Sequence, residues 1–400
     1  MVNGAGELSL YIHVPWCLAR CGYCDFNTYL HDPVLAPPYL QALELELDLA
    51  ARTLGWRRVT TIYFGGGTPT LLSPGDYARL LQAVRAHFTI DGAAEITTEA
   101  NPETLSLPQL EQLRKAGVNR LSLGMQSAVP HVLATLDRAH LPGRVDQAVQ
   151  WARQAGFENL SLDLMYGTPG ESREDWERTI SAALVLEPEH ISAYSLIVED
   201  ATPLGRRIAN EELVELEDDE LAEMYLLANE RFSDAGLRWY EVSNWAKPGY
   251  ECQHNLVYWR SGDWWGLGAG AHSHLRGSLT GEPPPPPNPR RRTPGKERRP
   301  QATRWWNYRH PRTYIEKLTT TGSPREDLEE LNAYETHTEV VMLGLRLAEG
   351  LNLDHLSVTE QARAAHFLEA GFLTVEASHL VPTEPGRLIA DGLAREILDR

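Results

Sequence analysis

Short apolar segments alternate with amphipathic segments over the first half of the chain. Apolar residues recur with helical spacing in Pro74–Phe88, Leu107–Ala116, Val145–Ala155 and Glu174–Leu186. Residues 43–49 alternate like a strand, but their leucine and glutamate content favours a helix over residues 39–54. The remaining apolar segments have the length and composition of strands, and they are Ser9–Val14, Val59–Phe64, Glu95–Thr98, Arg120–Gly124, Asn159–Met165 and His190–Leu196.

Six strands alternating with helices predict an α/β fold with a parallel sheet and right-handed crossovers. This pattern alone leaves a doubly wound open sheet as an alternative. The motifs described below each fall where a predicted strand ends, and this is where functional loops lie on a (β/α) barrel. We therefore expect a partial (β/α)6 barrel of the TIM type.

The end of the chain has a different pattern. Amphipathic spacing predicts helices over Glu335–Ala348, Ser357–Ala370 and Gly386–Ile397. Two short apolar runs, Phe372–Val375 and Leu380–Pro382, lie between the last two helices and predict a small hairpin. Helices followed by a hairpin and a final helix indicate a small α-rich, winged-helix-like domain.

A segment rich in proline and arginine separates these two parts. Its composition, with a run of five prolines in residues 283–287, predicts a disordered or polyproline insert without a packed core. We therefore expect a barrel with an extension over residues 1–280, an insert over 281–303 and a C-terminal domain over 304–400. The basic character of the insert also raises the alternative of docking to an anionic membrane surface or to acidic partners.

Composition and charge narrow the class of protein. The chain has 400 residues, 42% of them hydrophobic, and a formal net charge of −18. Such a charge argues against nucleic acid as a partner, because phosphate binders need a basic face. Four cysteines do not form a disulfide framework, and no stretch approaches the ~18 apolar residues of a membrane span. With no visible signal peptide, these features predict a cytoplasmic protein.

Three of the four cysteines lie within eight residues, at Cys17, Cys21 and Cys24, in a C-x3-C-x2-C pattern. A closed [4Fe–4S] site takes four cysteines, so three thiolates leave one iron open for chemistry. A structural zinc site with His13 as the fourth ligand is the alternative. Zinc sites usually combine two separated C-x2-C knuckles, and no second knuckle follows here.

Other polar or glycine-rich positions fall at the ends of the following strands. The loop Gly65–Thr70 has three successive glycines, which let backbone amides approach a ligand closely. Glu99, Gln126 and Asp163 lie at or near the ends of the next three strands. A single polar residue at such a place is usually a cap or a solvated side chain, whereas several around one barrel mouth indicate a shared ligand.

The cysteine loop, the Gly-Gly-Gly-Thr-Pro-Thr loop, Leu-Gly-Met-Gln-Ser at 123–127 and Asp-Leu-Met-Tyr-Gly-Thr-Pro at 163–169 together resemble the HemN/HemW branch of the radical S-adenosylmethionine (SAM) superfamily. The likeness runs from about residue 8 to 275 and resumes after the insert. It implies that the three cysteines hold a [4Fe–4S] cluster and that SAM binds its open iron. The residues it implies for SAM are Tyr11, Gly66, Gly67, Thr68, Glu99, Gln126, Arg138 and Asp163.

Two features separate this chain from the dehydrogenases of that branch. The dehydrogenases carry a further cysteine two residues after the third, where this chain has Phe26. The motif His254-Asn-Leu-Val-Tyr-Trp259 matches the H-N-x-x-Y-W pattern of the HemW branch. A histidine is a competent axial ligand of heme iron, so we expect His254 to contact heme, with Cys252, His272 and His274 as open alternatives.

The resemblance therefore implies a heme chaperone that binds the cluster, SAM and heme, and passes heme to acceptor proteins. It also implies an electron donor, and neither partner is identified by the sequence. The enzyme alternative is an oxygen-independent coproporphyrinogen III dehydrogenase, which decarboxylates propionates by radical chemistry. Radical modification of RNA is disfavoured by the charge.

Overall fold

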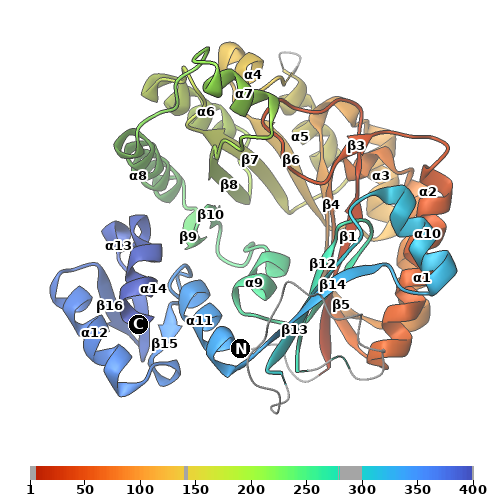
Figure 1. Cartoon of the computed structure of the whole chain (residues 1–400). Coiled ribbons are helices and arrows are strands. Elements are labelled where there is room, and N and C mark those ends of the chain that lie inside the picture. The colour runs from red at the N-terminus through yellow and green to blue at the C-terminus, as the bar shows by residue number, and fades with distance from the viewer. Residues whose placement is uncertain (1–5, 139–142, 278, 280–299, 399–400) are drawn as a thin grey trace.

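The protein is built around one large curved sheet that carries helices on its outer side. The computed structural model describes residues 6–138, 143–277, 279 and 300–398. In these residues twelve strands form a single sheet in the order β14-β13-β12-β11-β1-β4-β5-β6-β7-β8-β10-β9. Figure 1 shows the sheet curving around an inner side that faces α9 and the C-terminal elements.

The predicted parallel strands form the centre of this sheet. Neighbouring strands from β1 to β8 pair in parallel, as the alternation with helices predicted. Their buried apolar side chains form the main core with the covering helices. The strands are β1 (Glu7–Val14), β4 (Arg58–Gly66), β5 (Thr89–Ala100), β6 (Arg120–Gln126), β7 (Leu160–Tyr166) and β8 (His190–Ser195).

The predicted helices connect these strands, and the ambiguous run at 43–49 is helical. Two of the helices begin with a capping box, Ser73 with Asp76 and Ser172 with Asp175, which fixes where each one starts. The connecting helices are α1 (Ala36–Leu54), α2 (Pro74–His87), α3 (Leu107–Ala116), α4 (Pro130–Thr135), α5 (Arg144–Gln154) and α6 (Arg173–Val185).

Six further strands extend the sheet at both edges. On one side β11 (Trp264–Leu267) pairs in parallel with β1, and the antiparallel strands β12 (His272–Arg276), β13 (Ala302–Asn307) and β14 (Arg325–Leu331) follow. On the other side β10 (Asn244–Ala246) and β9 (Arg238–Glu241) are antiparallel. The order ends at β14 and β9, so the sheet is a partial barrel, as expected.

Smaller elements complete the first part of the chain. The short strands β2 (Trp16–Cys17) and β3 (Tyr29–Leu30) pair with each other around the cysteine loop. Three further helices are α7 (Pro203–Ala209), α8 (Asp218–Asp234) and α10 (Pro311–Thr321). The helix α9 (Gln253–Trp259) lies on the inner side of the sheet (Figure 1). No helix in the described residues is both long and apolar enough for a membrane span.

The C-terminal elements form a second core. They are α11 (Ala333–Gly344), β15 (Leu351–Asn352), α12 (Val358–Glu369), β16 (Leu373–Glu376), β17 (His379–Pro382), α13 (Glu384–Leu388) and α14 (Ala390–Leu398). Their buried residues, from Val341 to Ile397, form a hydrophobic cluster separate from the barrel core. One prediction was wrong in detail, because the helix expected over Gly386–Ile397 is divided at Ile389, where φ reaches −120°.

The division of the chain at residues 280 and 304 stays a prediction. The insert at 281–303 lies almost entirely outside the described residues. The strand β13 begins at Ala302, inside the expected insert, and it pairs with β14 in the large sheet before α11 begins.

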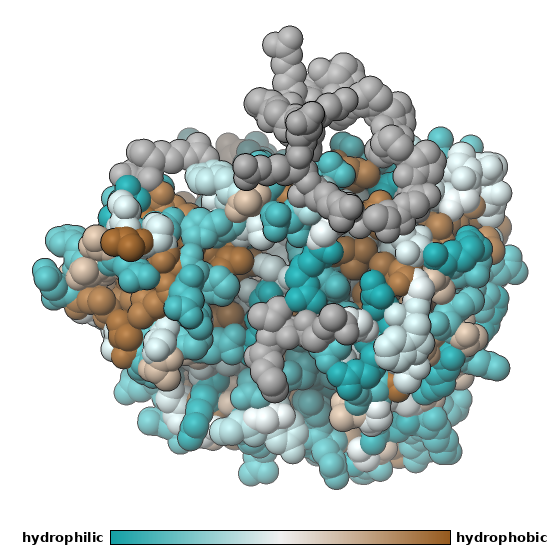
Figure 2. All heavy atoms as spheres, turned by 90° about the horizontal axis from the view of Figure 1, so that it is seen from below, coloured by the Kyte–Doolittle hydropathy of each residue, from teal (hydrophilic) through white to brown (hydrophobic). Residues whose placement is uncertain are grey.

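The C-terminal elements contact the barrel through a small set of interactions. The amide of Ala348 donates to the carbonyl of Tyr240 at 2.9 Å, and Leu347 forms a β-bridge with Glu241. Arg260 forms two hydrogen bonds of 2.8 and 2.6 Å with Glu349. Seen from below (Figure 2), the surface is mostly hydrophilic, with hydrophobic residues gathered towards the left, the side on which these elements lie in Figure 1.

Candidate cofactor site

The three clustered cysteines lie in the loop after β1. All three are half-buried and unpaired, and Cys17 belongs to β2. Burial raises the pKa of the Cys21 thiol, the neighbouring Cys24 raises it further, and Arg138 lowers it. The three thiols and one guanidinium therefore lie close enough to interact. Thiolates held together in a partly buried loop are stabilised by a cationic metal centre.

Which metal centre the cysteines hold stays a prediction, and two observations bear on the zinc alternative. In the residues that the structure describes, no three His, Cys, Asp or Glu side chains converge closely enough to hold one metal ion. A [4Fe–4S] cluster takes each cysteine at a different iron, so its ligands stand farther apart. His13, the fourth ligand expected for zinc, has both ring nitrogens hydrogen-bonded. Nδ1 bonds the Tyr11 hydroxyl and Nε2 bonds the carbonyl of Asn27, both at 2.9 Å.

The glycine-rich loop after β4 is packed directly against the cysteine loop. The amide of Gly67 donates to the carbonyl of Val14 at 2.8 Å, and that of Thr68 donates to Trp16 at 2.7 Å. A Cβ atom on Gly67 would lie 2.5 Å from the Trp16 carbonyl oxygen and 2.9 Å from the sulfur of Cys17. A residue larger than glycine would displace the cysteine loop, so this glycine shapes the place expected for the cluster.

Glu99 joins the glycine-rich loop to the inner side of the sheet. Its carboxylate accepts from the Tyr63 hydroxyl at 2.9 Å and from the amide of Gly66 at 3.0 Å. Burial raises its pKa to about 7, and the nearby Asp163 adds to the rise. A half-buried carboxyl with spare acceptor capacity suits the ammonium or the ribose diol of SAM.

The side chains of Gln126 and Arg138 both lie close to Gly124. Gln126 has a left-handed backbone with φ of 63° and lies at a bulge between β6 and β7. A Cβ atom on Gly124 would lie 2.9 Å from the amide nitrogen of Gln126 and 3.1 Å from a guanidinium nitrogen of Arg138. The Nε of Arg138 is buried without a hydrogen-bond partner. Strained backbone and an unsatisfied buried donor are features of ligand sites.

Asp163 is held by one serine of the adjacent strand β6 and one of its own strand β7. Ser122 donates to its two oxygens at 2.9 and 3.0 Å, and Ser161 donates at 3.3 Å. Burial raises the pKa of Asp163. Since Asp163 in turn raises the pKa of Glu99, the two carboxyls share one region of the inner face.

A pocket of about 790 Å³ opens on this inner face. Three residues expected at SAM line it, namely Tyr11, Gly66 and Glu99. Aromatic and charged side chains line other parts of it, including Phe26, Tyr258, Trp264, His272, Trp306 and Arg309. Pockets of this volume commonly hold small ligands and cofactors.

The structure places His254 behind the pocket rather than in it. The side chain is fully buried, with Nδ1 at 2.7 Å from the Thr61 hydroxyl and Nε2 at 2.7 Å from the hydroxyl of Tyr258. Its ring stacks on Tyr63 with centroids 5.1 Å apart. Burial lowers its pKa to about 3. Heme contact by His254 stays a prediction, and it requires the bond to Tyr258 to open.

The three alternative heme ligands differ in how exposed their side chains are. Cys252 is fully buried, and burial raises the pKa of its thiol to about 12. His274 is buried, with Nδ1 at 2.7 Å from the carbonyl oxygen of Gly262. His272 is exposed and lines the pocket.

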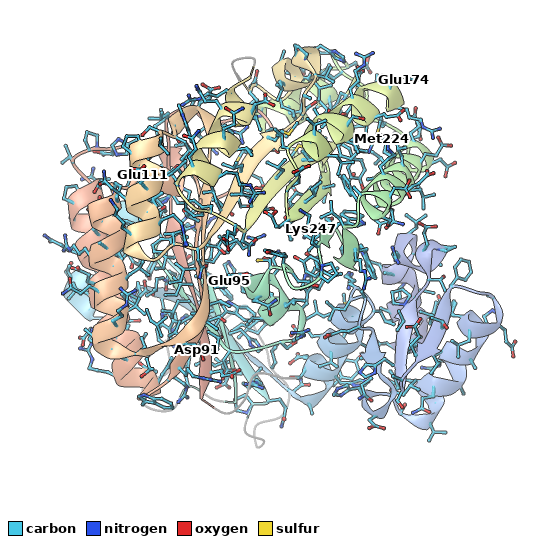
Figure 3. The ribbon with its side chains drawn as sticks, turned by 180° about the vertical axis from the view of Figure 1, so that it is seen from behind. Asp91, Glu95, Glu111, Glu174, Met224 and Lys247 are labelled. Atoms are coloured by element: carbon cyan, nitrogen blue, oxygen red, sulfur yellow. The ribbon has the colours of Figure 1, made fainter. Side chains whose placement is uncertain are left out.

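Sequence reasoning missed the role of Glu95, which holds the start of α9. Its carboxylate accepts from the amides of Gln253 and His254 at 3.1 Å each, and the thiol of Cys252 lies 3.6 Å away. Figure 3 shows Glu95 on β5 beside α9. Its position within an alternating strand gave no signal of this long-range contact. Trp306 and Arg309 were missed because they follow the insert and reach the pocket only through strand pairing.

Comparison with known proteins identifies the class. Residues 11–183 match the model of the radical SAM superfamily, and residues 331–389 match that of the HemN C-terminal domain. The chain resembles the coproporphyrinogen III oxidase HemN of Escherichia coli in structure, with a TM-score of 0.79 over 98% of this chain and 90% of that one, at 22% identity. The fold and the cysteine loop therefore define a radical SAM protein, a family that implies a [4Fe–4S] cluster and SAM.

The branch follows from more similar relatives. A protein of Mycobacterium tuberculosis named heme chaperone HemW is 46% identical over 97% of this chain and 94% of its own length. A protein of the same name from Escherichia coli is 36% identical over 96% and 97%. The chain belongs to the HemN/HemW branch of the radical SAM superfamily.

Proposed function

We propose that this protein is a heme chaperone that binds a [4Fe–4S] cluster, SAM and heme, and delivers heme to acceptor proteins. The names of relatives that span nearly the whole chain support this function. The structural observation that carries it is the shared pocket. One part of its lining consists of residues expected at SAM, and another presents aromatic rings and an exposed histidine.

In this proposal different residues hold the cluster and SAM. Cys17, Cys21 and Cys24 hold the cluster, and its open iron anchors SAM. The guanidinium of Arg138 lies near the cysteines, and its Nε has no hydrogen-bond partner. It therefore suits the carboxylate of SAM. Gly66, Gly67 and Thr68 shape the methionine end, while Tyr11, Gln126 and the two carboxyls Glu99 and Asp163 complete the pocket.

The dehydrogenase remains the alternative function. The fold similarity to the coproporphyrinogen III oxidase favours a tetrapyrrole-sized site in the same barrel. Against it stands Phe26, which occupies the position of the additional cysteine of the dehydrogenases. Its side chain is 64% exposed and lines the pocket. An exposed ring there suits contact with a flat apolar ligand and supplies no thiol.

The partners belong to the proposal as well. Heme-accepting proteins and an electron donor are required, and their identities are open. We propose a cytoplasmic location without nucleic acid as a partner. Peripheral membrane association through the basic insert is an additional possibility within this proposal, and the insert lies almost entirely outside the described residues.

The test is an anaerobic heme titration of the cluster-reconstituted protein, followed by transfer to a heme-free acceptor such as apomyoglobin. We expect saturable binding and a heme spectrum that changes to that of the acceptor on mixing. The same preparation is incubated with SAM, a reductant and coproporphyrinogen III. Decarboxylated product without specific heme binding would overturn the chaperone and establish the dehydrogenase.

A further inference from the structure

His272 differs from the other histidines around the pocket. In the described part of the chain, neither ring nitrogen of His272 has a hydrogen-bond partner, whereas His13 and His254 have both nitrogens bonded. The ring is exposed and lines the pocket. Burial of part of the ring lowers its pKa, and Arg304 and Arg309 add to this effect. A lowered pKa favours the neutral imidazole, which is the form that coordinates iron.

Aromatic side chains lie around this imidazole. His272 lies directly opposite Trp306 in the β12–β13 pair, and the two rings stack with centroids 5.8 Å apart at an interplanar angle of 24°. Tyr258 and Trp264 line the same pocket, with their rings edge to face at 4.7 Å. Trp306 therefore holds the imidazole in one orientation, and Tyr258 and Trp264 add apolar contact area to the pocket.

One cationic group marks where the anionic edge of such a ligand would lie. Arg309 lines the pocket, and its guanidinium has no ion-pair or hydrogen-bond partner among the residues described. Its carbonyl accepts from the side-chain amide of Asn27 at 2.9 Å, which ties its backbone to the cysteine loop. Asp25 and Glu326 also line the pocket and would repel carboxylates. The position of Arg309 is therefore the favourable one for a propionate.

We propose that heme lies in this pocket with His272 as the axial ligand of its iron and a propionate paired with Arg309, while Trp306 stacks on the imidazole and orients it. This inference rests on the proposed function. It assigns His254 a positioning role, because its Nε2 orients the hydroxyl of Tyr258, which itself lines the pocket.

The first test compares His272→Ala with the control His355→Ala, an exposed histidine of the C-terminal domain. Heme is titrated under anaerobic conditions and followed by absorption. We expect His272→Ala to weaken binding about tenfold and to lose the spectrum of a histidine-ligated iron, with the spectrum restored by added imidazole. The control keeps wild-type affinity and spectrum. An unchanged spectrum and affinity in His272→Ala would overturn the assignment.

A second pair of variants tests the propionate contact. Arg309→Gln is compared with Arg312→Gln, an exposed arginine on α10 that does not line the pocket. We expect only Arg309→Gln to weaken heme binding, and we expect the difference to vanish when the propionates are esterified. Equal binding by both variants would remove Arg309 from the site. Failure of the wild type to bind heme would instead overturn the proposed function, so the two failures are distinguishable.

Discussion

At the scale of the residue, the surroundings of Glu99 determine the pKa of its carboxyl group. Burial is the main reason that its pKa rises to about 7, and Asp163 contributes in the same direction. The Tyr63 hydroxyl, the Gly66 amide and Arg120 act in the opposite direction. A carboxyl with this pKa is mostly protonated at pH 6 and mostly ionised at pH 8.

SAM binding should therefore strengthen as the pH rises through 7, because the ligand is cationic and the ionised carboxylate attracts it. One unit on either side of the pKa changes the ionised fraction about tenfold, so the affinity should rise by up to that factor between pH 6 and 8. Anaerobic calorimetry at both values measures this. In Glu99→Gln the pH dependence should disappear, and its persistence there would assign it to another group.

At this scale, the sequence is most informative about residues that are close together in the chain. The spacing of Cys17, Cys21 and Cys24 determines that their thiols share one loop. By contrast, Arg138 resembles a surface charge in the sequence and was assigned to the site only through the family resemblance. The structure buries its Nε beside the cysteines. Burial depends on residues far away in the chain, which a local pattern does not record.

At the scale of the element, α9 shows how a short helix is fixed by side chains from other strands. Glu95 of β5 accepts from two amides at its start. His254 joins Thr61 of β4 to Tyr258 on the same helix. A helix of seven residues has little stability of its own, so these contacts determine its position.

Replacement of His254 by alanine should destabilise the protein by about 3 kcal/mol, because it leaves a cavity and removes a hydrogen-bond partner from the Thr61 and Tyr258 hydroxyls. Chemical denaturation followed by circular dichroism measures the change. His272→Ala is the matched comparison, and it should alter stability by no more than about 0.5 kcal/mol, since that side chain is exposed. Equal stability of the two variants would contradict the structural role given to His254.

The strands of the parallel core were predictable, whereas those of the extension were not. Buried parallel strands have continuous apolar runs that stand out in the sequence. The edge strand β14, with the sequence Arg-Glu-Asp-Leu-Glu-Glu-Leu, is half-exposed and highly charged, as edge strands often are. Composition therefore gave no strand signal, and pairing with β13 determines the conformation.

At the scale of the whole molecule, the C-terminal elements contact the barrel next to β9 and α9. Leu347 is buried in one cluster with Tyr240, Cys252 and Leu256. In this hydrophobic cluster, Leu256 belongs to the H-N-x-x-Y-W motif and Cys252 lies just before it. Loosening this contact should therefore reach the pocket residue Tyr258 through α9.

Leu347→Ala should cost about 3 kcal/mol at this interface. Hydrogen exchange of residues 240–257 should become faster in the variant, while that of the parallel strands should not change. The control is Leu388→Ala, since Leu388 is 42% exposed. Unchanged exchange in Leu347→Ala would show that the C-terminal elements are held by other contacts.

The sequence by itself determined the alternation of strands and helices, the cysteine loop and the glycine-rich loop. It also determined that Glu99 and Gln126 lie near strand ends and that Asp163 lies within a strand. These features are local, because periodicity and spacing act over a few residues. Only the tertiary structure decided that His254 is buried with both nitrogens bonded and that His272, Trp306 and Arg309 line the pocket with Tyr11 and Glu99. Strand pairing brings these distant segments together, and the accessibility of each side chain follows from that packing.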